Sequence, residues 1–205
     1  MRKSVALSAI AALSLAGPAM ADGFSYNYIE GGLGSSELEI EGLSGNADGE
    51  GGYLGGSGEL SKHLFGFING TSMEYEDVLR ITSSSLGLGF NWALGPNLDL
   101  VSTLSVDRIE LKVDGDAEDE DGYGLGVGLR GRIGERFEWT VGGKYRDIDV
   151  TKIATFNLGG RYYFTPRFAL GAEVIANEYE DDETSDTLDE SIVMVTFRYD
   201  FGTRH

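Results

Sequence analysis

The 205-residue sequence contains no cysteine, only three prolines and only two histidines. Without cysteine the chain can form no disulfide framework, no thiolate metal site and no cysteine nucleophile. Beyond its first 21 residues it also lacks an apolar run of the ~20 residues that a transmembrane helix needs, because Ser, Gly and Asn interrupt even the long uncharged stretch 81–98. If the chain is embedded in a membrane, it must therefore be a β-barrel.

Basic residues are scarce as well, with 16 Lys and Arg against 34 Asp and Glu. An excess of negative charge repels the phosphates of nucleic acid. We therefore expect no nucleic-acid partner.

The first 21 residues match the pattern of a cleaved secretory signal peptide. Arg2 and Lys3 give a basic start, an apolar run extends from Val5 to Leu15, and Ala19-Met20-Ala21 supplies small residues for cleavage. An uncleaved anchor is the alternative, but this run is too short to cross about 30 Å of hydrocarbon as a helix. We expect export through the general secretory pathway, with residues 1–21 as signal peptide. The mature domain, residues 22–205, then has 14 basic and 34 acidic residues and a net charge of −20.

The strongest signal is an alternation of apolar with small or polar residues, which is the two-residue period of a β-strand. It is clearest in 85–94, 123–133, 137–146 and 193–201. In the first of these segments Leu86, Leu88 and Phe90 alternate with serine, glycine and asparagine. Each strand thus has one apolar face and one polar, glycine-rich face.

Both a soluble β-sandwich and a membrane barrel show this alternation. In a sandwich the polar face meets water and carries bulky solvated residues, whereas here it consists of Gly, Ser, Thr and isolated charges of both signs. Glycine inside a strand contributes no side-chain contacts, but facing a narrow lumen it leaves room for long side chains from neighbouring strands. The pattern therefore favours an all-β fold, a single closed antiparallel transmembrane β-barrel.

Turn signals divide the mature chain into hairpins. Short turns are expected at 61–63, 95–97, 134–136 and 165–167, and longer acidic loops around 39–50, Asp77, 114–121, 147–151 and 178–189. Such an asymmetry is typical of the periplasmic and extracellular ends of a barrel. Four turns and five loops join ten strands that begin near Phe24, Gly51, Leu64, Leu79, Leu98, Gly122, Phe137, Lys152, Phe168 and Leu188. Eight strands remain the alternative, if the weakly patterned hairpins at Asp77 or Asp147 fold otherwise.

Aromatic residues cluster beside the predicted short turns, where a barrel carries an interfacial girdle. This set consists of Phe65, Phe67, Phe90, Trp92, Phe137, Trp139, Tyr162, Phe164, Phe168 and Phe201. A sparser girdle at the other end would consist of Tyr75, Tyr123 and Tyr145. Core aromatics are the alternative, but these residues lie at strand ends rather than strand middles.

Three stretches resemble small proteobacterial outer-membrane β-barrel proteins of the porin-like superfamily. They are 26–32 (YNYIEGG), 98–102 (LDLVS) and 122–131 (GYGLGVGLRG). The resemblance spans the mature chain and implies a barrel fold and an outer-membrane location, and its motifs carry no catalytic residues. The C-terminal strand, with Tyr199 and Phe201 as alternating aromatics, resembles the signal that the barrel-assembly machinery binds, although 202–205 follow Phe201.

The polar face carries charges that can point into the lumen. They are Glu59, Glu74, Asp99, Glu138, Glu173, Arg130, Arg132, Lys144, Arg146, Arg161 and Arg198. Opposed charges of this kind would form an ion-pair network that stiffens and blocks the barrel. The alternative is a narrow water-filled pore with weak anion preference, since ten strands enclose little more than a packed interior. Inward glycines such as Gly87, Gly89, Gly126 and Gly128 favour some open space.

Acidic residues are concentrated in the predicted outer loops, within 114–121 and 178–190. Carboxylates are the oxygen ligands that Ca²⁺ and Mg²⁺ prefer, and the candidate ligands are Asp114, Asp116, Glu118, Asp181 and Asp182. An EF-hand starting at Asp114 would need Gly and Glu where the sequence has Asp119 and Leu125. We therefore favour solvated loops that share divalent cations with lipopolysaccharide phosphates over a specific metal site.

Catalysis and a bound cofactor are not expected. Neither His63, in a predicted periplasmic turn, nor His205, at the C-terminus, can join a catalytic constellation at the outer rim. The sequence predicts a non-enzymatic outer-membrane barrel with a structural, envelope-stability or cell-surface interaction role, in contact with outer-membrane lipid and lipopolysaccharide. A narrow passive channel for small solutes or ions is the alternative.

Overall fold

The computed structural model describes residues 23–40, 46–75, 79–113, 116–149, 151–181 and 187–201. The predicted signal peptide, residues 1–21, lies outside the described residues. Within them there is no helix long and apolar enough to cross a bilayer. The strands are β1 (Tyr28–Ile40), β2 (Asn46–Ser61), β3 (Leu64–Tyr75), β4 (Leu79–Gly95), β5 (Leu98–Val113), β6 (Asp116–Ile133), β7 (Phe137–Ile148), β8 (Thr151–Tyr163), β9 (Phe168–Asp181) and β10 (Thr187–Asp200).

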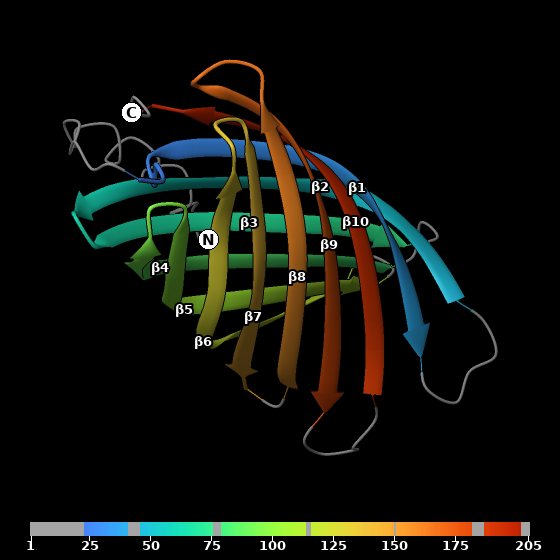
Figure 1. Cartoon of the computed structure of the whole chain (residues 1–205). Helices are drawn as coiled ribbons and strands as arrows, with labels where there is room; N and C mark the ends of the chain where they lie inside the picture. Colours follow the sequence, from blue (N-terminus) through green and yellow to red (C-terminus); the bar gives the residue numbers. More distant parts are fainter. Residues whose placement is uncertain are drawn as a thin grey trace, which may run out of the picture.

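Each strand pairs with its neighbour in sequence and β1 pairs with β10, so the antiparallel sheet closes into a barrel. Closure leaves no strand edge without hydrogen-bond partners, as the hydrocarbon of a bilayer requires. Strands β7 to β10 cross strands β2 to β5 steeply in Figure 1, as tilted strands on opposite walls of a barrel do. The predicted all-β closed barrel of ten strands is confirmed, and the eight-stranded alternative is wrong.

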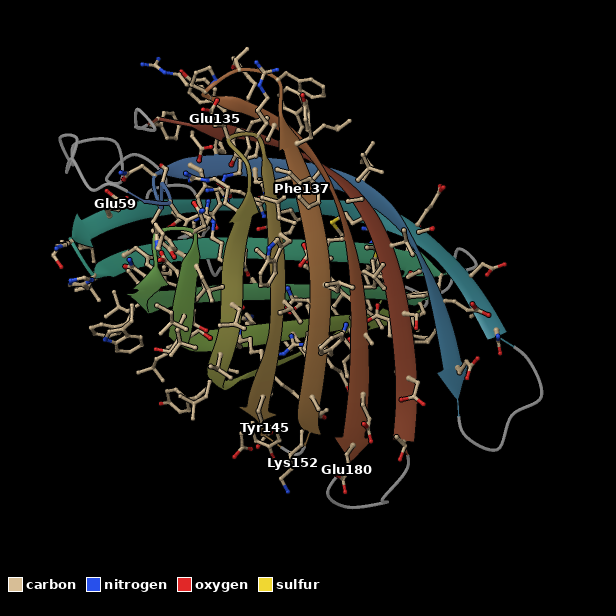
Figure 2. All side chains as sticks on the ribbon, viewed as in Figure 1. Glu59, Glu135, Phe137, Tyr145, Lys152 and Glu180 are labelled. Carbon is tan, nitrogen blue, oxygen red and sulfur yellow. The ribbon has the colours of Figure 1, made fainter. Side chains whose placement is uncertain are left out.

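The two ends of the barrel differ in their connections. Four connections, 62–63, 96–97, 134–136 and 164–167, lie at the same end as the first and last strand residues, and we call this the turn end. The other five connections lie at the opposite end, which we call the loop end. In Figure 2 Glu135 and Phe137 mark the turn end, and Tyr145, Lys152 and Glu180 mark the loop end. The four short connections lie where the turn signals predicted them.

The strands are longer at the loop end than we expected. β2 begins at Asn46 rather than Gly51, β6 begins at Asp116 rather than Gly122, and β9 continues to Asp181. Every loop-end connection between two strands has five residues or fewer. The prediction of long acidic loops was wrong because the backbone of these acidic residues continues the strand pairing, as 116–121 of β6 do along β5.

The polarity of the two faces reverses along the strands. In the middle of β5, Val106 is exposed on the outer face while Asp107 is buried in the lumen. One step nearer the loop end, the outward residue is the exposed Arg108 and the inward one is the buried Ile109. An apolar outer face with a polar inner face suits a barrel wall in lipid, whereas a polar outer face with an apolar inner face suits a wall in water. The wall therefore extends beyond its apolar band at the loop end.

A broad apolar band covers the outer face of the barrel. Its exposed members include Leu33, Leu54, Leu86, Leu88, Leu104, Leu125, Val127, Phe156, Val174, Val193, Val195 and Phe197. A soluble protein of this size does not expose so large a continuous apolar surface. The alternation therefore directs the apolar side chains to lipid and the small or charged ones to the lumen.

A hydrophobic cluster occupies the lumen near the loop end. Its buried members come from opposite walls of the barrel, including Met73 and Tyr75 of β3 and Ile153 of β8. The remaining buried members are Leu38, Ile81, Ile109, Ile148, Ile192 and Met194. Because residues of opposite walls pack in one cluster, the cluster spans the lumen.

Three aromatic residues assigned to the girdles point inward instead. Phe65 and Tyr75 are buried, and Phe67 is half-buried against a second inner cluster at the turn end. A Cβ at Gly87 would lie 2.7 Å from the ring of Phe67, and one at Gly89 would lie 2.0 Å from the ring of Phe65. The space expected from these inward glycines is therefore filled by aromatic rings.

The rest of the turn-end girdle surrounds the outer face as predicted. Phe90, Trp92, Phe137, Tyr162, Phe164, Phe168 and Phe201 are exposed there, and Tyr123 and Tyr145 are exposed nearer the loop end. Trp139, two residues from Phe137 on the same strand, is half-buried. Aromatic side chains favour the interface between lipid and water. The two girdles mark the edges of the apolar band.

Candidate luminal site

A buried charge cluster in the turn-end half of the lumen is centred on Glu138 of β7. Its carboxylate accepts hydrogen bonds from Arg130 Nη2 at 2.8 Å, from Arg130 Nε at 3.2 Å and from Arg132 Nη2 at 3.4 Å. The Glu138 side chain is fully buried and both arginines are nearly so. Arg132 is opposite Glu138 in the pairing of β6 with β7, and Arg130 lies two residues away on the same face. One carboxylate thus balances two buried guanidinium groups.

Glu30 of β1 lies between two further arginines. Its Oε2 is 3.5 Å from Arg161 Nη1 and 3.8 Å from Arg198 Nη1. Arg198 Nε also donates to Asp200 Oδ1 at 3.0 Å, and Arg198 Nη2 lies 3.0 Å from the same oxygen in an ion pair. Its guanidinium carbon is 3.4 Å from the centre of the Tyr28 ring, a cation–π contact. These contacts join β1, β10 and β8 along one side of the lumen.

A third ion pair reaches across a strand. Asp107 of β5 accepts hydrogen bonds from Lys144 Nζ of β7 at 2.6 Å, from Ser105 Oγ at 2.8 Å and from Ser85. The intervening strand β6 has Gly124 at this level, where a Cβ would lie 2.2 Å from Asp107 Oδ2 and 2.5 Å from Lys144 Cε. Any larger residue at position 124 would separate the two charged groups. The ion pair therefore depends on glycine at this position.

Residues 23–27 extend into the turn end of the lumen. The prediction that the first strand begins near Phe24 was wrong, because β1 begins at Tyr28. The backbone oxygen of Ser25 accepts hydrogen bonds from Arg130 Nη1 at 2.9 Å and Arg198 Nη2 at 3.0 Å. Phe24 is buried, with the guanidinium carbon of Arg130 4.8 Å from its ring centre. The segment is therefore held by side chains that also belong to the charge clusters.

Tyr26 makes the remaining connections of this N-terminal segment. Its backbone N–H donates to Glu59 Oε1 at 3.0 Å, and its phenol donates to Asp99 Oδ2 at 2.9 Å. The ring stacks on Phe65, with 4.6 Å between ring centres. Burial is the main cause that raises the pKa of the Tyr26 phenol, and Asp99 adds to it, so the phenol remains a donor. The N-terminal segment thus contacts both the charged and the aromatic walls of the lumen.

Nearer the loop end a polar group borders the hydrophobic cluster. The buried carboxylate of Glu190 accepts hydrogen bonds from Asn177 Nδ2 at 2.7 Å, from Tyr179 Oη at 2.6 Å and from Tyr75 Oη. Arg146 donates from Nη1 to Ser83 Oγ at 2.9 Å. The lumen therefore has two layers. The Glu138 and Glu30 clusters lie in the turn-end half, and the apolar cluster, bordered by Glu190 and Arg146, lies nearer the loop end.

The structure places most of the predicted luminal charges on inward positions. Glu173 accepts a hydrogen bond from Asn157 Nδ2 at 2.8 Å inside the barrel. Glu74 differs, because it lies on the outer face near the loop end and pairs with Arg80. Sequence reasoning missed Glu30, Asp107, Glu190 and Asp200, all of which are buried in the lumen. Residues an even number of positions apart on one strand share a face. Asp200 lies two residues and Glu190 eight residues from Arg198 on β10, so both could have been assigned to the lumen once Arg198 was.

The candidate metal ligands do not form a site within the described residues. Glu118 is an exposed residue of β6 that pairs with Leu111, and Asp116 and Asp181 are strand ends. Asp114 and Asp182 lie outside the described residues. In the described part of the chain no three His, Asp or Glu side chains converge on a point that could hold a metal ion.

His63 occupies the short connection between β2 and β3, where it is exposed at the turn end. Its Nδ1 lies 3.1 Å from the backbone oxygen of Asn91. His205 lies outside the described residues. The imidazole of His63 is thus at the opposite end of the barrel from the acidic loop end.

A cavity of about 310 Å³ lies among these layers in the middle of the lumen. Its walls include Arg130, Lys144, Arg161 and Arg198 together with the rings of Phe65 and Phe67. The charge clusters and the N-terminal segment lie on its turn-end side. The cavity is thus an open space between the cationic and the aromatic residues of the lumen.

Comparison with the solved structure of Neisserial surface protein A supports the fold. Neisserial surface protein A matches with a TM-score of 0.51 and 15% identity over 86% of this chain and 98% of that chain. The outer membrane protein OprG from Pseudomonas aeruginosa matches with a TM-score of 0.45 and 11% identity over 90% of this chain and 100% of that chain. The outer membrane protease OmpT from Escherichia coli matches with a TM-score of 0.48 and 11% identity over 87% and 98% of the two chains. No curated protein matches the sequence.

A family model gives the assignment at the level of sequence. The model of the outer membrane protein beta-barrel domain matches residues 5–155, which is more than half of the chain. The fold of this chain is the closed antiparallel barrel described above. The outward apolar band is the surface that such a barrel presents to lipid. The chain belongs to the outer membrane protein beta-barrel domain family, a family of the Gram-negative outer membrane, as its resemblance to small outer-membrane barrels implied.

Proposed function

We propose that this protein is a non-conducting, non-enzymatic barrel with a structural, envelope-stability or cell-surface interaction role. In this proposal residues 1–21 are removed as a signal peptide during secretory export. The C-terminal strand, with Tyr199 and Phe201 in alternation, is bound by the barrel-assembly machinery. The loop end then faces the exterior and the turn end the periplasm.

The observation that carries this proposal is the filling of the lumen at two levels. The apolar cluster around Met73 and Ile153 spans the lumen near the loop end. The N-terminal segment and the Arg130–Glu138 ion pair occupy the turn end. Ions crossing such an interior would meet an apolar barrier with no replacement for their hydration shell. A filled lumen supports a role at the surface of the barrel.

The refolded mature protein should give no reproducible single-channel steps in planar bilayers. The physical reason is the filling of the lumen by the apolar cluster near the loop end and by the N-terminal segment at the turn end. A general porin, refolded and inserted in the same way, is the positive control for insertion. Regular steps of one size from the purified protein would favour the passive-channel alternative instead.

The acidic loop end supports a role at the lipopolysaccharide layer. Glu39 of β1 is opposite Asp189 of β10, which is opposite Glu178 of β9, so three exposed carboxylates lie in one row on the outer face. Like charges directly across neighbouring strands are destabilising. Divalent cations bound between these carboxylates and lipopolysaccharide phosphates would relieve the repulsion, since both groups supply hard oxygen ligands.

In lipopolysaccharide-containing bilayers, EDTA should lower the unfolding temperature of the barrel. We expect a shift of about 2–4 °C, the change that ~1 kcal/mol causes in a chain of this length. The triple variant Glu39→Gln, Glu178→Gln, Asp189→Asn should lose most of this shift, and the turn-end variant Glu135→Gln should keep it. An equal EDTA effect in pure phospholipid bilayers would contradict the role of lipopolysaccharide.

A further inference from the structure

We propose that the cavity in the middle of the lumen is a binding site for a small aromatic carboxylate. The cavity measures about 310 Å³. Ligand pockets for small molecules begin at about 300 Å³, so this one suits a ligand with a single ring. The identity of the ligand class follows from the chemistry of the cavity walls.

One wall of the cavity is cationic. Arg130, Lys144, Arg161 and Arg198 line it, and no Asp or Glu does. Their carboxylate partners lie behind them, as Glu138 lies behind Arg130 and Asp107 behind Lys144. A ligand in the cavity would therefore meet N–H donors and no acidic group. Such a wall favours an anion and disfavours a cation.

Most hydrogen-bond donors of Arg161, on β8, are not used within the described part of the barrel. A guanidinium has five N–H donors in a planar fork that matches a carboxylate. Among the described residues the only hydrogen bond of Arg161 is the long one, 3.5 Å, from Nη1 to Glu30 Oε2. Arg130, by contrast, makes two hydrogen bonds to Glu138 and one to Ser25. Arg161 is therefore the residue that can form a two-point contact with a ligand carboxylate.

The opposite wall is aromatic. Phe65 and Phe67 belong to β3, which lies five strands from β8 in either direction around the ring of ten. Their ring centres are 6.3 Å apart, and Tyr26 stacks on Phe65. Aromatic rings stack on one another or meet edge to face, which adds to the effect of burial. A molecule with a carboxylate at one end and a ring at the other would match both walls at once.

Binding is tested with benzoate on the mature protein refolded in detergent micelles. Equilibrium dialysis with labelled ligand, corrected for uptake by empty micelles, should show one saturable site for benzoate. Benzamide, which has the same shape without the charge, should bind at least tenfold more weakly, and benzylamine should not compete. Equal binding of benzoate and benzamide, or no saturable binding of benzoate, would overturn the proposal.

Variants test which residues form the site. Arg161→Gln should weaken benzoate binding at least tenfold, whereas Arg136→Gln, at an exposed turn position, should leave it unchanged. Phe67→Leu should weaken benzoate binding several-fold without changing the weak binding of acetate. Each variant is first shown to be folded by its heat-modifiable migration on a gel. A folded Arg161→Gln variant that binds benzoate as tightly as the parent would refute the role of this arginine.

Discussion

Replacing Glu138 by alanine should lower the free energy of unfolding of the barrel by about 3–5 kcal/mol, the usual cost of removing one partner of a buried ion pair. Glu138 is fully buried and is bonded to both Arg130 and Arg132. Its loss would leave two guanidinium groups in the lumen without their shared carboxylate. Arg130 also holds the N-terminal segment through its hydrogen bond to the backbone oxygen of Ser25, so the loss of Glu138 would disturb this contact as well.

The matched control for this substitution is Glu135→Ala. Glu135 lies three residues away in the exposed turn between β6 and β7, and Figure 2 shows it at the turn end. We expect its replacement to change stability by less than about 0.5 kcal/mol. Both variants are compared by urea titration in phospholipid vesicles, followed by tryptophan fluorescence. If the midpoint of Glu138→Ala matched that of Glu135→Ala, the ion-pair cluster would have no structural role.

The strand count could be predicted because period and turn signals agree. Alternation assigns each side chain to lipid or lumen, and four short turns fix where the hairpins reverse. Glu138, Arg130 and Arg132 could be placed inside for the same reason, since they occupy the polar face of strands with clear alternation. Their pairing follows from register, because neighbours on β6 and β7 must lie side by side.

The loop end was predicted less well because its environment changes. A wall in lipid has apolar residues outside, and the same wall in water has them inside. At Arg108 and Ile109 of β5 the alternation continues, but the polar residue is now on the outer face and the apolar residue is in the lumen. An acidic stretch such as 116–121 therefore resembles a loop in composition while its backbone continues a strand. Nothing in the local sequence marks where the apolar band ends.

Contacts across the lumen could not be predicted either. Which side chain of β8 faces which side chain of β3 depends on the stagger between strands that accumulates around the barrel. The position of the N-terminal segment has a similar cause, because Phe24 and Tyr26 alternate with polar residues just as a strand would. Their burial against Arg130 and Phe65 depends on space that the closed barrel leaves at its turn end.

An arginine at the centre of the lipid-facing band should be nearly as costly as the loss of Glu138. Val195 of β10 is exposed on the outer face between Leu33 of β1 and Ala172 of β9. Val195→Arg should destabilise the barrel by about 2–4 kcal/mol, the cost of arginine at the middle of a bilayer. The reason is that the guanidinium must stay solvated while its strand is fixed in hydrocarbon. The measurement is again the urea titration in phospholipid vesicles.

Ser191→Arg on the same strand is the matched control. Ser191 is also exposed on the outer face, but it lies four residues nearer the loop end and is opposite Glu37 of β1. Near the edge of the apolar band the cost of arginine falls to about 0–1 kcal/mol, and Glu37 can pair with it. The difference between the two variants therefore reports depth in the bilayer rather than the chemistry of arginine. Equal effects of the two substitutions in vesicles would mean that the outward band does not lie in lipid as its composition requires.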